Sequence, residues 1–111
     1  MSALAEKIRK AREVRVMVDD MTLIVRRPTD LEMIELRGAK MGRAILPFVA
    51  GWENVSELSM LGNGSPHPID YDADACAAWL EDRIDILGRL VDEAFKAYSA
   101  HQEALSSAVK N

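Results

Sequence analysis

Two short runs of alternating residues, 14–18 and 21–26, are separated only by Asp19 and Asp20. β-Branched and other apolar residues that recur at every second position are typical of a half-buried strand. Short polar residues such as these two aspartates tolerate the backbone of a tight turn. The pattern therefore predicts a β-hairpin. Because an isolated hairpin is only marginally stable in water, a helix must cover it or another strand must extend it.

Three segments outside the hairpin have the apolar spacing of helices. Residues 3–12 predict a short helix with Ser2 as its N-cap, but its apolar content is thin, so we expect segment 1–12 to fray or to dock on something else. A second helix is predicted over residues 30–45, and the longest one from about Ile84 onward. The apolar stripe of this last helix consists of Leu87, Leu90, Val91, Ala94, Phe95, Tyr98, His101 and Leu105.

The middle of the chain is less regular. Residues 47–58 combine bulky apolar residues with a glycine and form a boundary segment, and the glycines and prolines that follow predict a mobile loop over 59–69. Asp72 is placed to cap a further short helix. We expect one α+β domain over residues 1–111, in which an N-terminal β-hairpin packs against three to four helices, the last of them long.

The charge distribution restricts the partners of the chain. Its 111 residues have a formal net charge of −4, which disfavours the phosphate backbone of nucleic acid as the main partner. Residues 1–50 hold ten Lys/Arg and seven Asp/Glu, whereas residues 51–111 hold four and eleven. Copies could stack through these unlike halves, or each half could simply have a solvated polar face. No apolar run is long enough for a membrane span and no secretory signal is visible, so we expect no membrane partner.

Catalytic and metal-binding motifs are not evident. The two histidines lack the spacing of a metal site, and the single cysteine, Cys76, sits among alanines. Asp70, Asp72 and Asp74 alternate like the start of a calcium loop, but alanine stands at the position of its turn glycine, and helix capping explains these residues more simply. We expect no cofactor and no catalytic residue. An enzyme or ligand-binding domain using Asp72, Asp74 and Glu81 is the weakest alternative.

Two further features have both a structural and a functional interpretation. Trp52, in the boundary segment, is either a core residue or part of a binding surface. Arg26 and Arg27 form the most compact basic pair, which either contacts a partner or pairs with Glu32 or Glu35.

The order of several short motifs resembles a known family. The hairpin runs into Val25-Arg26-Arg27-Pro28-Thr29-Asp30-Leu31-Glu32, a helix follows, and then come Phe48-Val49-Ala50-Gly51-Trp52-Glu53-Asn54-Val55 and Pro68-Ile69-Asp70-Tyr71-Asp72. This arrangement, over residues 13–100, is similar to the tail assembly chaperones and related tail-morphogenesis proteins of long-tailed bacteriophages and prophages. Two positions depart from that pattern. Asn54 stands where a glycine is usual, and Arg83-Ile84-Asp85 replaces Arg-Pro-Asp.

The resemblance implies a non-enzymatic role in the host cell cytoplasm. Such proteins bind the tape-measure protein until tail-tube subunits assemble around it, they tend to self-associate, and contact with the tail-tube protein is also conceivable. An alternative is a structural minor tail or head–tail connector protein that stays in the virion. The predicted partner-binding residues are Phe48, Val49, Trp52, Val55, Arg26 and Arg27. We expect Trp52→Ala to weaken tape-measure binding with little change in fold. The stripe of the last helix is a further candidate surface, although core packing explains it better.

Overall fold

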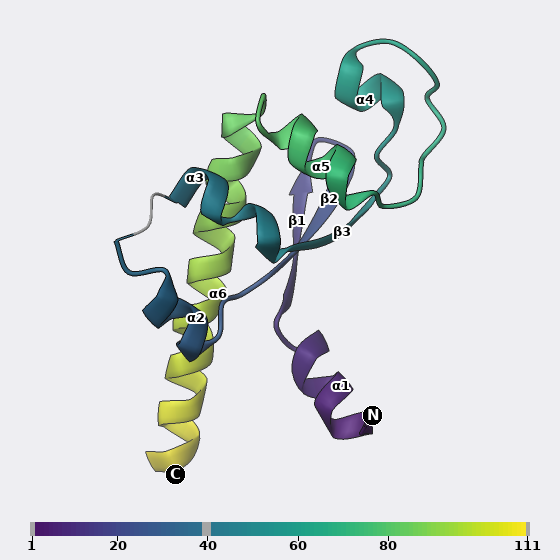
Figure 1. The fold of residues 1–111 in the computed structure, drawn as a ribbon. Helices are drawn as coiled ribbons and strands as arrows, with labels where there is room; N and C mark the ends of the chain where they lie inside the picture. The colour runs from purple at the N-terminus through teal and green to yellow at the C-terminus, as the bar shows by residue number, and fades with distance from the viewer. Residues whose placement is uncertain (1, 39–40, 111) are drawn as a thin grey trace.

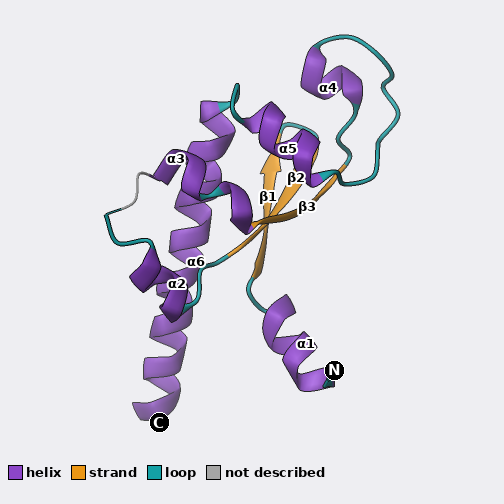
Figure 2. Ribbon diagram, in the orientation of Figure 1, coloured by secondary structure: helices purple, strands orange, loops and turns teal. Residues whose placement is uncertain are grey.

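The structure, a computed structural model, describes residues 2–38 and 41–110. Over these residues a three-stranded antiparallel sheet packs with helices, which confirms the predicted α+β class (Figures 1 and 2). The elements are α1 (Ala3–Lys10), β1 (Glu13–Val18), β2 (Met21–Arg26), α2 (Asp30–Glu35), α3 (Met41–Ala44), the 3-10 helix η1 (Leu46–Phe48), β3 (Val49–Glu53), α4 (Glu57–Leu61), α5 (Ala73–Leu80) and α6 (Ile84–Lys110). The molecule is elongated, with extents of 53 × 34 × 26 Å.

The predicted hairpin is present as β1 and β2. Val16 lies opposite Leu23 in the antiparallel register, and both side chains are buried, whereas Arg15 and Met17 on the other face of β1 are exposed. Asp19 has a φ of 55°, so the turn uses the left-handed backbone that aspartate tolerates. The period-two pattern is thus explained by a sheet with one face turned toward the core.

A third strand extends the hairpin, and the sequence pattern did not reveal it. β3 pairs antiparallel with β2, so that Trp52 lies opposite Leu23 and β2 becomes the central strand. After β3, Asn54 has a φ of 60° and its Nδ2 donates to the carbonyl oxygen of Asp20 at 2.7 Å. β3 has only five residues and contains a glycine, so neither its length nor its alternation distinguishes it from a loop.

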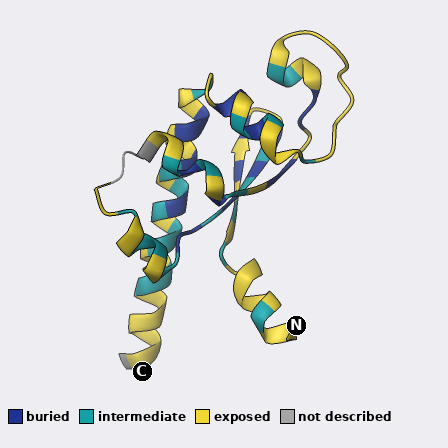
Figure 3. Cartoon of the chain, viewed as in Figure 1, coloured by how far each residue is buried: buried dark blue, intermediate teal, exposed yellow. Residues whose placement is uncertain are grey.

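The core lies between one face of the sheet, α5 and the first half of α6 (Figure 3). Trp52 is at its centre: its ring packs edge-to-face on Tyr71 and on Trp79, with centroids 5.1 and 6.3 Å away, and its Nε1 donates to the carbonyl oxygen of Ile69 at 2.9 Å. The buried apolar residues are Val16, Val18, Met21, Leu23, Val25, Ile45, Phe48, Trp52, Val55, Cys76, Trp79, Leu80, Ile86, Leu87, Leu90 and Ala94.

The single helix predicted over residues 30–45 is wrong. α2 begins with a capping box, in which Thr29 Oγ1 accepts from the backbone N–H of Glu32 and Glu32 accepts from that of Thr29, but it ends after six residues. Gly38 has a φ of 78°, a left-handed conformation that no helix continues. A second short helix, α3, follows, and Pro47 lies in η1 rather than ending a long helix.

The loop predicted over 59–69 begins later than expected. Residues 59–61 belong to α4, which ends at Gly62 with a left-handed φ of 79°. From Gly62 the chain continues without helix or strand to the start of α5, and its end is tied to the body because the N–H of Ile69 donates to the carbonyl oxygen of Val55 at 2.9 Å. That this loop is mobile stays a prediction.

The predicted caps of the first helix and of the helix after Asp72 are confirmed. Ser2 Oγ accepts from the N–H of Ala5 at 3.0 Å, and Asp72 Oδ1 accepts from the N–H of Ala75 at 3.1 Å. α1 has no buried residue and stands away from the sheet (Figure 1). Fraying of this helix stays a prediction. α6 begins at Ile84, as the sequence predicts.

Candidate partner-binding groove

Most of the predicted apolar partner-binding residues lie in the core. Phe48, Trp52 and Val55 expose only 5%, 6% and 0% of their surface, and Val49 is partly buried against them. In this conformation they stabilise the fold and present almost no surface. Partner binding through these four residues stays a prediction, and it requires the core to open.

Arg26 and Arg27 have different surroundings although they are adjacent. Arg26 donates to both carboxylate oxygens of Glu32, at 2.8 and 2.9 Å, and its guanidinium stacks 4.4 Å from the ring centroid of Phe48. The predicted pairing with Glu32 is therefore confirmed. The Arg26 guanidinium lowers the pKa of the Glu32 carboxyl by hydrogen bonding, and this pair ties the end of β2 to α2.

Arg27 is buried and has no ion-pair partner among the described residues. The residue is 9% exposed, and its side chain makes a long hydrogen bond of 3.4 Å from Nη1 to the carbonyl oxygen of Pro28. The backbone N–H of Arg27 donates to the carbonyl oxygen of Arg12 at 2.8 Å, which continues the hairpin ladder beyond the pair of Glu13 and Arg26. Burial lowers the pKa of Arg27, and the like charge of Arg12 lowers it further.

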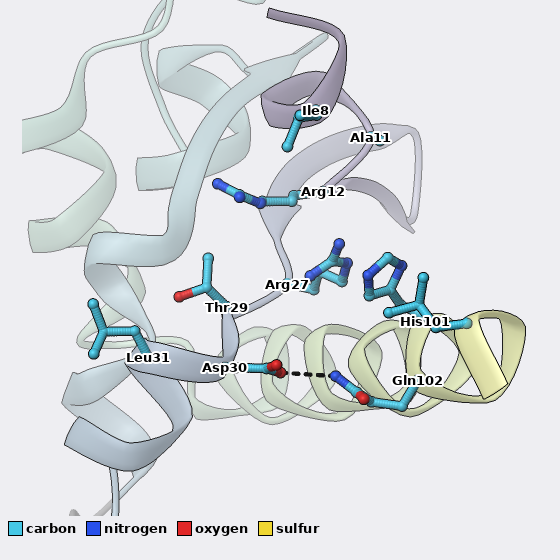
Figure 4. Close-up of a pocket in the computed structure, with 10 residues that line it drawn as sticks. Ile8, Ala11, Arg12, Arg27, Thr29, Asp30, Leu31, His101 and Gln102 are labelled. Atoms are coloured by element: carbon cyan, nitrogen blue, oxygen red, sulfur yellow. Dashed lines mark hydrogen bonds between the residues drawn. The ribbon is translucent and has the colours of Figure 1, made fainter. Parts of the chain in front are cut away.

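Arg12 and Arg27 line an open groove between α1, the start of α2 and the second half of α6 (Figure 4). Its volume is about 390 Å³. The residues that line it are Ile8, Ala11, Arg12, Arg27, Thr29, Asp30, Leu31, His101, Gln102 and Leu105.

The acidic residue of the groove is tied to α6. Asp30 Oδ1 accepts hydrogen bonds from the Tyr98 hydroxyl at 2.8 Å and from Gln102 Nε2 at 2.7 Å, the latter drawn in Figure 4. The hydrogen bond to Asp30 raises the pKa of the Tyr98 hydroxyl. Asp30 therefore fixes the start of α2 against α6. Its charge also favours the protonated form of Arg27, although the two do not form an ion pair within the described residues.

The groove has apolar walls that no other part of the described chain covers. Leu31, Leu105 and Ile8 expose 66%, 50% and 48% of their surface. Leu4 lies one turn before Ile8 on α1, and Val109 lies one turn after Leu105 on α6; they expose 66% and 87%. Each helix therefore presents an apolar ladder with a spacing of four residues.

The length of α6 explains this exposure. Its 27 residues span about 40 Å, whereas a strand of six residues spans about 20 Å. The sheet covers only the first half of the helix, and Ala94 is the last buried residue among those described in α6 (Figure 3). The stripe predicted from the sequence thus divides into a core part up to Ala94 and an exposed part from His101 to Val109.

The other chemically reactive groups are placed as structural residues. Burial raises the pKa of the Cys76 thiol to about 11. Asp72 caps α5. Glu81 Oε1 forms an ion pair with Arg43 Nη2 at a distance of 3.0 Å. Within residues 2–38 and 41–110, no group of three His, Cys, Asp or Glu side chains is arranged to hold a metal ion. Over the same residues, no helix has both the length and the apolar character that crossing a bilayer requires.

No family model, curated protein or solved structure matches this chain.

Several groove residues were not singled out as binding residues by sequence reasoning. Arg12 carries no sequence signal of its own, because its position opposite Arg27 becomes visible only when the hairpin register is known. His101 and Leu105 belong to the stripe of the last helix, which core packing explains better at the level of sequence. A sequence signal for the exposed part of α6 did exist, since a helix of about 40 Å is longer than the predicted hairpin can cover.

Proposed function

We propose that this protein is a non-enzymatic binding protein that holds an amphipathic helix of a client protein in the groove between α1, α2 and α6. The observation that carries the proposal is the set of exposed apolar side chains on three separate elements facing one groove, namely Ile8, Leu31 and Leu105. Surfaces of this kind, apolar with a polar rim, mark sites that bind other proteins. A helix in a groove buries such side chains through its own residues at i, i+4 and i+7.

The strength expected of this contact suits a reversible binder. Full burial of one Leu or Ile side chain contributes about 1.5–3 kcal/mol. Because Ile8, Leu31 and Leu105 are about half to two-thirds exposed, covering all three contributes about 2.5–5 kcal/mol before the costs of association. One groove alone therefore binds weakly. Several copies along a long client would bind firmly, yet each contact could still be released.

The sequence resemblance specifies the client within this proposal. A tail assembly chaperone binds the tape-measure protein, a long helical chain, and acts in the host cell cytoplasm. Two local conformations support the resemblance. Asn54, where a glycine is usual, has a φ of 60°, which suits glycine. Ile84, where proline is usual, is the first residue of α6, a position that proline favours.

Self-association is part of the same proposal. The basic excess of residues 1–50 and the acidic excess of residues 51–111 allow copies to contact through unlike charges. Several linked copies would supply the repeated weak contacts that a long client requires. Contact with the tail-tube protein is a further prediction of the resemblance.

The experiment is co-expression of the protein with the tape-measure protein of the same genome, followed by affinity capture and titration of the purified complex. Leu105→Asp introduces a charge into the apolar wall and should weaken binding at least tenfold. Ser107→Asp places the same charge on the other side of α6 and is the matched control. Equal binding by both variants would exclude the groove as the binding site. Mass spectrometry of purified virions separates this role from a structural one, because a chaperone should be absent or depleted.

A further inference from the structure

The two arginines of the groove are opposed in a way that folding alone does not explain. Arg12 and Arg27 are cross-strand neighbours beyond the ends of β1 and β2, since the Arg27 N–H donates to the Arg12 carbonyl at 2.8 Å. Like charges directly opposite each other on neighbouring strands are destabilising. Val14 and Val25, the preceding pair on the same face of the ladder, are both apolar and pack in or against the core. The sheet face therefore ends in two cations, and both line the groove beside the second half of α6.

The second observation is that neither arginine forms an ion pair within the described residues. Arg27 is 9% exposed and lines the groove, and its side chain makes a long hydrogen bond to a carbonyl oxygen 3.4 Å away. Within the described residues, neither Arg12 nor Arg27 has a carboxylate within 4.0 Å. Asp30, the nearby acid, already accepts two hydrogen bonds from α6 on Oδ1. An arginine residue with so little exposed surface normally has a carboxylate partner, because Lys, Glu, Arg and Asp are almost never buried unless they are paired.

We infer that the groove binds the carboxylate of a glutamate or aspartate side chain that the client helix presents between its own apolar residues. The inference rests on the proposed function and names the chemistry of the client. Arg12 and Arg27 donate to the carboxylate, while Ile8, Leu31 and Leu105 cover the apolar side chains on either side of it. Figure 4 shows the Arg27 side chain beside that of His101 and the Arg12 side chain further along the groove, all of them apart from the bonded pair of Asp30 and Gln102.

The surroundings favour a protein carboxylate over a free phosphate. Asp30 offsets one of the two arginine charges, so the groove is suited to a single negative charge rather than to a dianion. The apolar walls would be left uncovered by an inorganic ion. A helix that carries an acid within an apolar face satisfies both parts of the groove.

The probe is an amphipathic helical peptide of about 20 residues, long enough to form helix in water, with one Glu at the centre of its apolar face. A second peptide carries Gln instead. The unlabelled protein should bind the Glu peptide about ten- to a hundredfold more tightly in a fluorescence anisotropy titration, the range expected for hydrogen bonds to a charged group. Raising the salt concentration should reduce this preference.

Protein variants test whether Arg12 and Arg27 cause the tighter binding of the Glu peptide. Arg12→Gln and Arg27→Gln should each bring the Glu/Gln affinity ratio close to one, whereas Arg37→Gln, which removes an exposed charge outside the groove, should preserve it. Because Arg27 is buried, its variant is checked by circular dichroism and urea denaturation. Arg12 is half-buried and provides a second variant, and the peptide exchange requires no change in the protein.

The outcomes are distinct. If the unmodified protein binds both peptides with equal affinity, the inference is wrong while the groove as a helix-binding site stands. If it binds neither peptide, the proposed function and the inference both fail. A third arm titrates inorganic phosphate while the arginine Nε–H signals are followed by NMR. Saturation of the Arg27 signal by phosphate, together with equal binding of the two peptides, would assign the groove to a free oxyanion and overturn the inference.

Discussion

Trp52→Ala should unfold or strongly destabilise the protein rather than weaken partner binding alone. Trp52 is 6% exposed, packs edge-to-face on two aromatic rings and donates a hydrogen bond to Ile69. Replacement of a buried tryptophan by alanine costs about 3–5 kcal/mol, which is a large part of the 5–15 kcal/mol that stabilises an average domain. For a chain of this length, that loss corresponds to a decrease in Tm of about 12–20 °C.

Urea denaturation, followed by circular dichroism at 222 nm, measures this effect. Trp52→Phe is the matched variant: it keeps an aromatic ring near Tyr71 and Trp79 but removes the indole N–H. We expect it to cost about 1–2 kcal/mol, mainly from the lost hydrogen bond. If Trp52→Ala lowered the free energy of unfolding by less than about 1 kcal/mol, the central position of Trp52 in the core would be wrong. The sequence-based expectation of a binding defect in an intact fold would then be restored.

Two other predictions concern the thiol and the assembly state. Because burial raises the pKa of Cys76 to about 11, the folded state holds the thiol proton more firmly than the unfolded state does. This contribution to stability is constant below the unfolded thiol pKa, and it decreases as the pH rises from there to about 11. Urea titrations at pH 7.5 and 10 should show a larger decrease in the free energy of unfolding for the native chain than for Cys76→Ala, and an equal decrease in both would refute this role of the thiol. Light scattering should give a mass above that of one chain at low salt and a lower mass in 1 M NaCl, because salt screens the attraction between opposite charges. A monomer at every salt concentration would exclude association between the basic residues of segment 1–50 and the acidic residues of segment 51–111.

The sequence predicts those parts of the fold that local chemistry determines. The hairpin follows from period-two alternation around Asp19-Asp20, and two of the caps follow from Ser2 and Asp72, whose side chains accept the free N–H groups of a first turn. The sequence does not predict β3, because a strand of five residues forms by pairing with β2 and has no distinctive pattern of its own. The helix over 30–45 was overextended, because the apolar spacing continues through Gly38 although the backbone there is left-handed.

The candidate site was harder to predict because its residues meet only in three dimensions. An apolar stripe has the same sequence pattern whether it faces a core or a partner, so Leu90 and Leu105 are equivalent until the length of the sheet is known. Phe48 and Trp52 show the converse ambiguity, because their pattern suits a core as well as a binding surface, and the structure buries both. Tryptophan removes so much apolar area from water that a chain with few aromatic residues places it in its core.

The pair of Arg12 and Arg27 is the clearest case in which the residues of this chain conflict with the positions that the fold gives them. A sequence that specifies one fold has local choices that agree with the global structure, and conflicts between the two concentrate at functional sites. Here the conflict is electrostatic: two cationic residues are cross-strand neighbours at the end of a ladder whose preceding pair is apolar, and one of them is buried. An apolar residue at position 27 would relieve both the repulsion and the desolvation. If Arg27→Leu raises the free energy of unfolding while it abolishes the preference for an acidic peptide, the arginine serves binding at the expense of stability; if it destabilises the chain, the arginine is a structural residue.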